Sequence, residues 1–149
     1  MIAYTRYRAD ALTFPLEDFA VIHASPPCQR FSLASRFHPG TQERYPDHIE
    51  VMRRRLVATG KPYILENVVG VPLRNPVVLC GAMFGLRVYR HRLFESNVFL
   101  FRHVHVRHAH KAATPGAIAR GDEFWSVGGH FGHKDEAQRA MGIDWMHGV

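Results

Sequence analysis

The stretch Phe19-Ala-Val-Ile-His-Ala24, followed by Ser25-Pro-Pro-Cys-Gln-Arg-Phe-Ser32, decides the expected fold. Its first six residues are mostly apolar and suit a short strand buried in a parallel sheet. The two prolines end that strand abruptly, because proline cannot donate a hydrogen bond to a neighbouring strand. The polar residues after the break, Cys28 among them, are therefore expected at the carboxyl end of a strand, where open α/β sheets place their sites.

A helix with clear start and stop signals comes later in the chain. Asp47 is a candidate N-cap, and Glu50 three residues on completes a pattern like a capping box. We expect the arginines at 53–55 to point largely away from the apolar face, and Gly60 and Pro62 to end the helix. The residues of the apolar face are Ile49, Met52 and Leu56.

Residues 61–69 read as a second buried strand, which finishes in Glu66-Asn67-Val68. We expect Asn75-Pro76 to open a short helix that runs towards Gly85. Two further strands are expected over residues 87–94 and 97–101. This alternation of strands and helices predicts an α/β domain with parallel strands.

The segment from Gln29 to Tyr45 shows no regular spacing of apolar residues, which predicts a long loop. Long loops in compact domains are often functional. We divide the chain into a catalytic α/β core over residues 1–98 and a small recognition or C-terminal region over 99–149.

Composition narrows the classes of protein. The chain has 149 residues, 46% of them apolar, and a formal net charge of +6, a surplus that favours polyanionic partners. With only two cysteines we expect no disulfide framework and a reducing compartment, so we expect a cytoplasmic protein. No apolar run reaches the roughly 20 residues that span a bilayer, and no signal peptide is evident, so no membrane partner is expected.

Two strand ends carry chemically reactive side chains. Cys28 follows the first strand and Glu66 ends the second, so a thiol and a carboxylate are expected over one ligand. A basic surround of Arg30, Arg90 and Arg92 would favour the thiolate that a nucleophilic cysteine requires. From the residues alone, a cysteine-dependent hydrolase remains a weaker alternative. Cys80, by contrast, reads as a small buried apolar residue.

The motifs around these residues resemble those of one enzyme family. Pro26-Pro-Cys-Gln-Arg-Phe-Ser32 resembles the Pro-Cys-Gln-x-x-Ser signature of the DNA cytosine carbon-5 methyltransferases. Glu66-Asn67-Val68 resembles their Glu-Asn-Val motif, and Arg90-His91-Arg92 is similar to their Arg-x-Arg motif, in the same order along the chain. Residues 9–12 resemble the acidic motif at an earlier strand end. Residues 140–146 resemble a segment of compact phage or bacterial members.

The resemblance implies a function and a set of site residues. It implies methyl transfer from S-adenosylmethionine to carbon 5 of a flipped cytosine in DNA. The reaction would pass through a covalent bond between the cysteine and the base. The setting that it implies is a bacterial cell or a phage-infected host. The catalytic residues that it implies are Cys28, Glu66, Asn67, Arg90 and Arg92. Those implied for the cofactor are Asp10, Ala11 and Pro26. Those implied for the DNA substrate are Pro27, Gln29, Arg30, Ser32, Arg36 and Arg44.

The chain departs from the family pattern in two places. No glycine precedes Gly40, so the glycine-bearing turn that cradles the methionine part of the cofactor is absent, and Val88 stands where the family usually has glutamine. We therefore expect a partial Rossmann-like methyltransferase fold, a parallel sheet with flanking helices that lacks its first strands. We also expect weak cofactor binding by this polypeptide alone, and a possible complementing chain that supplies those strands.

Three alternatives to an active DNA enzyme stay open. One is a catalytically dead module that binds nucleic acid, and another is one half of a split methyltransferase. The third, less favoured, is a tRNA cytosine methyltransferase, because the core motifs do not distinguish the two nucleic acids.

A histidine-rich stretch lies over residues 103–110. His-x-His pairs on a strand face the same way and can bind a metal, but no cysteine or carboxylate is close by in the sequence. We therefore predict no metal site and interpret the stretch as a solvated or phosphate-facing basic segment. The histidines concerned are His103, His105, His108 and His110.

Overall fold

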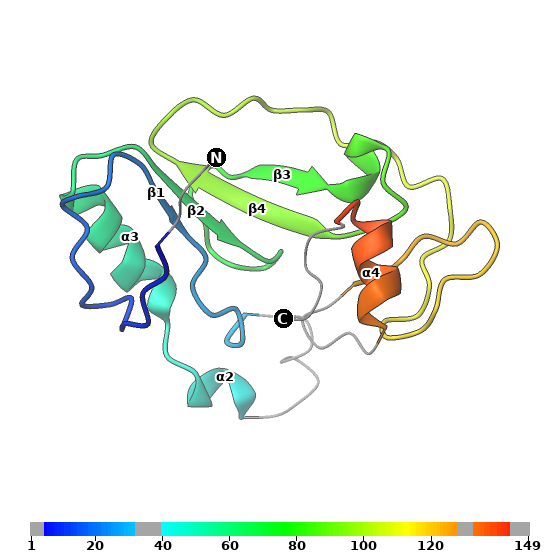
Figure 1. Cartoon of the computed structure of the whole chain (residues 1–149), viewed down its shortest axis with the longest axis horizontal. Coiled ribbons are helices and arrows are strands. Elements are labelled where there is room, and N and C mark those ends of the chain that lie inside the picture. The colour runs from blue at the N-terminus through cyan, green and yellow to red at the C-terminus, as the bar shows by residue number, and fades with distance from the viewer. Residues whose placement is uncertain (1–4, 32–39, 128–132, 144–149) are drawn as a thin grey trace. The chain divides into compact units, whose positions relative to one another are not determined.

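A computed structural model describes residues 5–31, 40–127 and 133–143 of the chain. It is an α/β structure with a small open mixed sheet of four strands in the order β1-β2-β4-β3 (Figure 1). The chain divides into two compact units, which we call unit 1 (residues 1–74 and 95–99) and unit 2 (residues 75–94 and 100–149). The domain division after residue 98 stays a prediction. No described helix has both the length and the apolar character needed to cross a membrane.

Unit 1 is built on a parallel pair of strands covered by a helix. Strand β1 (Ile22–Ala24) pairs with β2 (Tyr63–Asn67), as the sequence predicts, and helix α3 (His48–Ala58) lies against them (Figure 1). A shorter helix, α2 (Thr41–Arg44), precedes α3. The predicted apolar face of α3 is confirmed, because all three of its residues are buried. The buried core of unit 1 consists of Ile22, Ile49, Met52, Leu56, Tyr63, Leu65 and Val71.

The predicted start of α3 is also confirmed. Asp47 is the N-cap, and its carboxylate accepts a hydrogen bond from the backbone N–H of Ile49 at 2.9 Å. The side chain of Glu50 forms ion pairs with Arg53 and Arg54. The helix ends before Gly60, which has a φ of 66°, a left-handed conformation that suits glycine.

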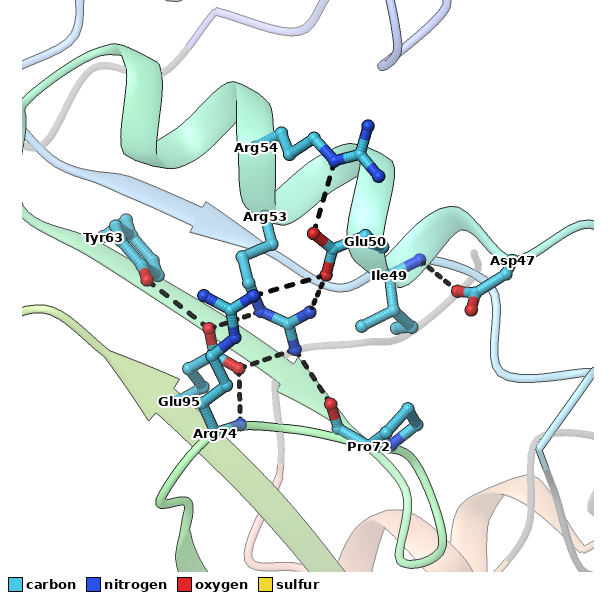
Figure 2. Close-up of polar contacts among 9 residues, drawn as sticks. All are labelled: Asp47, Ile49, Glu50, Arg53, Arg54, Tyr63, Pro72, Arg74 and Glu95. Atoms are coloured by element: carbon cyan, nitrogen blue, oxygen red, sulfur yellow. Dashed lines mark hydrogen bonds and ion pairs between the residues drawn. The ribbon is translucent and has the colours of Figure 1, made fainter.

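Arg53 corrects the expectation that the arginines of α3 point away from the core. Its guanidinium is buried and forms a two-pronged ion pair with Glu95, with Nε to Oε1 at 2.8 Å and Nη2 to Oε2 at 2.9 Å (Figure 2). Nη2 also donates to the carbonyl of Pro72 at 2.9 Å, and the N–H of Arg74 donates to Glu95 at 2.7 Å. An arginine is tolerated here because a buried carboxylate and a carbonyl satisfy its donors.

This buried ion pair changes the ionisation of both partners. The hydrogen bonds to Glu95 raise the pKa of Arg53 above its ordinary value, against the opposing effect of burial. Burial raises the pKa of Glu95, but the hydrogen bonds from Arg53 and from the N–H of Arg74 outweigh it, so the pKa of Glu95 is lowered. Both groups are therefore charged at neutral pH, and together they connect α3 to the end of β4.

Unit 2 contains an antiparallel strand pair. Strand β3 (Val77–Cys80) pairs with β4 (His91–Ser96), whose last two residues are counted with unit 1, and the 3₁₀ helix η1 (Gly81–Phe84) follows β3. Further on, the backbones of Tyr89 and Trp125 and of Ala113 and Phe124 are joined by hydrogen bonds of 2.9 and 2.8 Å. Helix α4 (Lys134–Ala140) lies near the end of the described chain.

Two expectations for the second half of the chain are wrong. The helix expected after Asn75 is strand β3, because Asn75 has a φ of 45°, whereas an N-cap takes an extended conformation. The strand expected over residues 97–101 is absent from that described segment. The side chain of Asn97 instead caps the start of β2, accepting from the N–H of Tyr63 at 2.9 Å and donating to the carbonyl of Lys61 at 2.8 Å.

Candidate active site

The carboxyl ends of β1 and β2 meet at one edge of unit 1. In the parallel register Ala24 lies opposite Leu65, so Ser25, directly after β1, comes at the level of Glu66, the last residue but one of β2. The hydroxyl of Ser25 donates a short hydrogen bond to the Glu66 carboxylate. This contact fixes the orientation of a carboxylate that the sequence alone places only at a strand end.

A second hydrogen bond joins the same two segments. The side-chain amide of Asn67 donates to the carbonyl of Pro26 at 2.8 Å, and its oxygen accepts from the N–H of Val68 at 2.9 Å. Asn67 is 2% exposed, so its amide is fully committed to the backbone on both sides. Asn67 therefore acts as a positioning residue that joins the Pro26-Pro27-Cys28 segment to the end of β2.

Cys28 lies two residues beyond that joint, at the start of a turn. Its thiol is outside any disulfide and its side chain is half-buried. The carbonyl of Cys28 accepts from the N–H of Phe31 at 2.9 Å, and the guanidinium of Arg30 donates to the carbonyl of Tyr45 at 2.9 Å. The segment that carries the thiol is therefore anchored on both sides, and the thiol is accessible in part to a ligand.

A cavity of about 540 Å³ opens beside the end of β1. Its walls come from residues 7–16, from residues 22–27, and from His48 and Met52 of α3. Such a volume suits a small-molecule site, for which the usual range is about 300–1,000 Å³. The three residues expected to bind the cofactor all line this cavity, together with Pro27; they are Asp10, Ala11 and Pro26.

The wall formed by residues 10–14 is held in place by polar contacts. The carboxylate of Asp10 accepts from the N–H of Leu12 at 2.8 Å, and the carbonyl of Asp10 accepts from the N–H of Phe14 at 2.9 Å. Arg55 of α3 donates to the carbonyls of Ala11 and Phe14. A turn without regular secondary structure thus becomes a defined wall because a helix arginine satisfies its carbonyls.

The remaining predicted site residues fall in other places. Arg90 and Arg92 belong to unit 2, where Arg90 donates to the carbonyl of Val127 at 3.1 Å and Arg92 to that of His91 at 2.8 Å. Gln29 is exposed next to Cys28, and Arg44 is exposed at the end of α2. Ser32 and Arg36 lie outside the described residues. The edge of unit 1 therefore brings together Pro26, Pro27, Cys28, Glu66 and Asn67.

Sequence reasoning missed three contributors to this edge. Ser25 orients Glu66, Arg55 holds the cavity wall, and His48 lines the cavity. Only Ser25 had a usable signal, because a polar residue directly after a buried strand faces its counterpart on the next parallel strand. The other two depend on where α3 packs, which the sequence of α3 does not specify.

Comparison with known proteins assigns the chain to no family. The chain matches no protein-family model, and no curated protein sequence matches it.

Proposed function

We propose that the chain is a cytosine carbon-5 methyltransferase of DNA, that its parallel strands belong to a Rossmann-like methyltransferase fold, and that Cys28 is the nucleophile. The observation that carries this proposal is the pair of hydrogen bonds from Ser25 to Glu66 and from Asn67 to Pro26. They join the segment that bears the thiol to the one that bears the carboxylate, an arrangement that covalent attack on a pyrimidine needs.

The chemistry assigns one role to each residue. With the target cytosine flipped out of the duplex, the Cys28 thiolate forms a bond to carbon 6 while Glu66 delivers a proton to ring nitrogen 3. The Pro27 carbonyl accepts from the exocyclic amine and so selects cytosine. S-adenosylmethionine, when bound, supplies the methyl group that carbon 5 takes. Loss of the carbon 5 proton and of the proton on nitrogen 3 then accompanies cleavage of the sulfur–carbon bond, which regenerates the thiolate.

The cavity beside β1 fits the adenosine part of that cofactor. Its walls are mostly apolar, with Ala11 and Pro26 to pack against the adenine and the Asp10 carboxylate as a hydrogen-bond acceptor. In this proposal Arg92, and Arg90 beside it, steady the base, a role that the resemblance implies. The net charge of +6 favours the DNA backbone.

Covalent trapping tests the proposal. The chain is incubated with S-adenosylmethionine and duplex DNA that contains 5-fluorocytosine, because fluorine at carbon 5 blocks the final loss of a proton. We expect an adduct that survives denaturation and whose mass includes the DNA and one methyl group. The adduct should vanish in Cys28→Ser and in reactions without S-adenosylmethionine.

Two further arms separate the alternatives. A tRNA that contains 5-fluorocytidine replaces the DNA, and an adduct with tRNA alone would move the substrate from DNA to tRNA. Equilibrium dialysis with labelled S-adenosylmethionine measures cofactor binding separately, because no glycine precedes Gly40. A chain that binds the cofactor and DNA but forms no adduct would contradict the proposed reaction and favour a nucleic-acid-binding module.

A further inference from the structure

A cluster of one cysteine and three histidines lies within unit 2, and one of its members, His91, stands between Arg90 and Arg92 in the sequence. Cys80 ends β3 and His91 begins β4, and the antiparallel register places these two residues directly opposite each other. His105 and His108 come from the segment after β4 that carries no regular secondary structure. One ligand atom from each of the four residues lies within 4.8 Å of all the others.

The distances inside the cluster are close to those of a metal site. The Sγ of Cys80 is 3.7 Å from Nε2 of His108, and Nε2 of His91 is 2.9 Å from Nε2 of His105. Around a tetrahedral zinc ion, bond lengths of about 2.3 Å to sulfur and 2.0–2.1 Å to nitrogen place neighbouring ligand atoms roughly 3.3–3.6 Å apart. Small side-chain adjustments therefore convert this cluster into a tetrahedral shell.

We infer that unit 2 binds one zinc ion through Cys80, His91, His105 and His108, and that this ion is structural. Four protein ligands complete a tetrahedral shell and leave no position for water or substrate, which distinguishes structural from catalytic zinc sites. A thiolate with three imidazoles is a donor set that suits zinc, and cobalt as its spectroscopic substitute.

The surroundings of the cluster support a bound ion. Cys80 is only 1% exposed, so the sulfur ligand of the cluster lies in the interior of unit 2. The ring of Tyr89 stacks on His108 with centroids 3.7 Å apart, and the ring of Phe124 stacks on Tyr89 with centroids 4.7 Å apart. These stacked rings restrict the orientation of His108, as the groups around a metal ligand commonly do.

The cluster also explains how an exposed segment is held in place. Every residue from 101 to 110 is exposed, and the segment includes the apolar Phe101, Val104 and Val106. A metal bound by His105 and His108 would tie it to the β3–β4 pair, which supplies Cys80 and His91. Binding energy of this kind adds directly to folding energy in small metal-bound units.

The interpretation of the histidine stretch as free of metal rested on the lack of a nearby cysteine. In three dimensions Cys80 supplies that cysteine, although 25 or more positions separate it from His105. The ligands from the stretch are also not an His-x-His pair. His103 packs edge-on against Phe84, and Nδ1 of His110 lies 3.7 Å from the carboxylate of Asp122.

Cobalt substitution tests the inference on the full chain, purified without a histidine tag and stripped of metal with a chelator. One equivalent of Co²⁺ should give the intense visible bands of four-coordinate cobalt together with a thiolate charge-transfer band, and one equivalent of Zn²⁺ should abolish both. Cys80→Ser should remove the thiolate band. His105→Ala should weaken Zn²⁺ binding by about 100-fold or more, since even outer-shell changes cost 10–100-fold.

Matched variants make the result specific. His103→Ala alters the same exposed segment outside the cluster and should bind Co²⁺ like the unmodified chain, and Cys28→Ser should keep the thiolate band. Six-coordinate cobalt spectra without a thiolate band, or equal losses in His103→Ala and His105→Ala, would overturn the inference. Because His105 is exposed, its substitution reports on the metal even if Cys80→Ser fails to fold. The readout is independent of methyl transfer.

Discussion

Units 1 and 2 are stabilised by different kinds of contact. In unit 1, large apolar side chains of α3, β1 and β2 form one buried core, and the Arg53–Glu95 ion pair is enclosed beside it. Among the described residues of unit 2, buried apolar side chains are fewer and mostly small. They are Val77, Cys80, Val88, Leu93, Ala113 and Ala137.

This difference indicates what each unit depends on. Burial of large aliphatic side chains supplies most of the stability of a domain, so unit 1 has the means to fold from its own core. The described residues of unit 2 add stacked rings, such as Tyr89 on His108, and the histidines around Cys80 to a core of smaller side chains. We therefore expect substitutions in unit 1 to act through the core and those in unit 2 to act through local fit.

The largest effect is expected from Glu95→Ala, which breaks the buried ion pair of unit 1. Arg53 is 4% exposed and would keep its charge with only the half-buried Glu50 carboxylate and the Pro72 carbonyl as partners. Removing one member of such a pair costs about 3–5 kcal/mol. Hydrogen exchange measured with Zn²⁺ added should show lost protection in α3 and β2 while β3 keeps its protection.

Arg54→Ala is the matched control, because Arg54 pairs with Glu50 on the same helix at an exposed position. Exposed pairs of this kind contribute about 0.3–0.5 kcal/mol. Equal losses of stability in Glu95→Ala and Arg54→Ala would show that the buried ion pair contributes no more than the exposed one. The contrast between the units would then rest on the apolar core alone.

Acid should weaken unit 1 through the same carboxylate, by less than its removal. The pKa of Glu95 in the folded chain lies below its ordinary value of 4.5, so the stabilisation is present above pH 4.5 and is lost as pH falls through the folded pKa. Free energies of unfolding measured across this range should fall with pH in the unmodified chain and change less in Glu95→Gln. An equal pH dependence of stability in the two proteins would contradict the assignment of this effect to Glu95.

The sequence predicts unit 1 better than unit 2, and the reason is physical. The apolar spacing of α3 and the proline break after β1 are local signals, and the structure has both elements. Strand β1 covers only Ile22–Ala24 of the predicted 19–24, and Phe19 and Val21 are exposed. Arg53 escaped prediction because its burial depends on Glu95, 42 residues away. The same applies to β3, whose antiparallel pairing with β4 overrides the helix signal of Asn75-Pro76.

The candidate sites differ in the same way. Cys28 comes shortly after β1 and Glu66 lies near the end of β2, so the sequence identifies both as an edge pair, and the structure joins their segments through Ser25 and Asn67. The Cys80 cluster draws on two paired strands and a distant exposed segment. No local pattern in the sequence places Cys80 beside His108, so only the fold reveals that group.

A smaller effect is expected from Gly81→Ala, which tests local fit in unit 2. A methyl group at Gly81 would lie 2.4 Å from Cγ1 and 2.7 Å from the carbonyl oxygen of Val88, so the backbone must shift. Overpacking of this kind costs about 1–3 kcal/mol. Denaturant unfolding followed by hydrogen exchange should place the loss in β3 and β4.

A double-mutant cycle checks the cause. Val88→Ala removes one of the two close contacts, so Gly81→Ala should cost less in that background than in the unmodified chain. Strictly additive losses would mean that the glycine is needed for another reason.

The smallest effect is expected from Asp47→Ala, which removes the N-cap of α3 and leaves the core of unit 1 intact. The Asp47 carboxylate satisfies the N–H of Ile49, and losing such a cap costs about 1 kcal/mol. Asp47→Asn keeps a side-chain acceptor and should retain most of the stability, as measured by denaturant unfolding. Because Ile49 is itself a core residue, a loss far above this value would mean that the cap also fixes its packing, so that the start of α3 and the apolar core of unit 1 form one cooperative element.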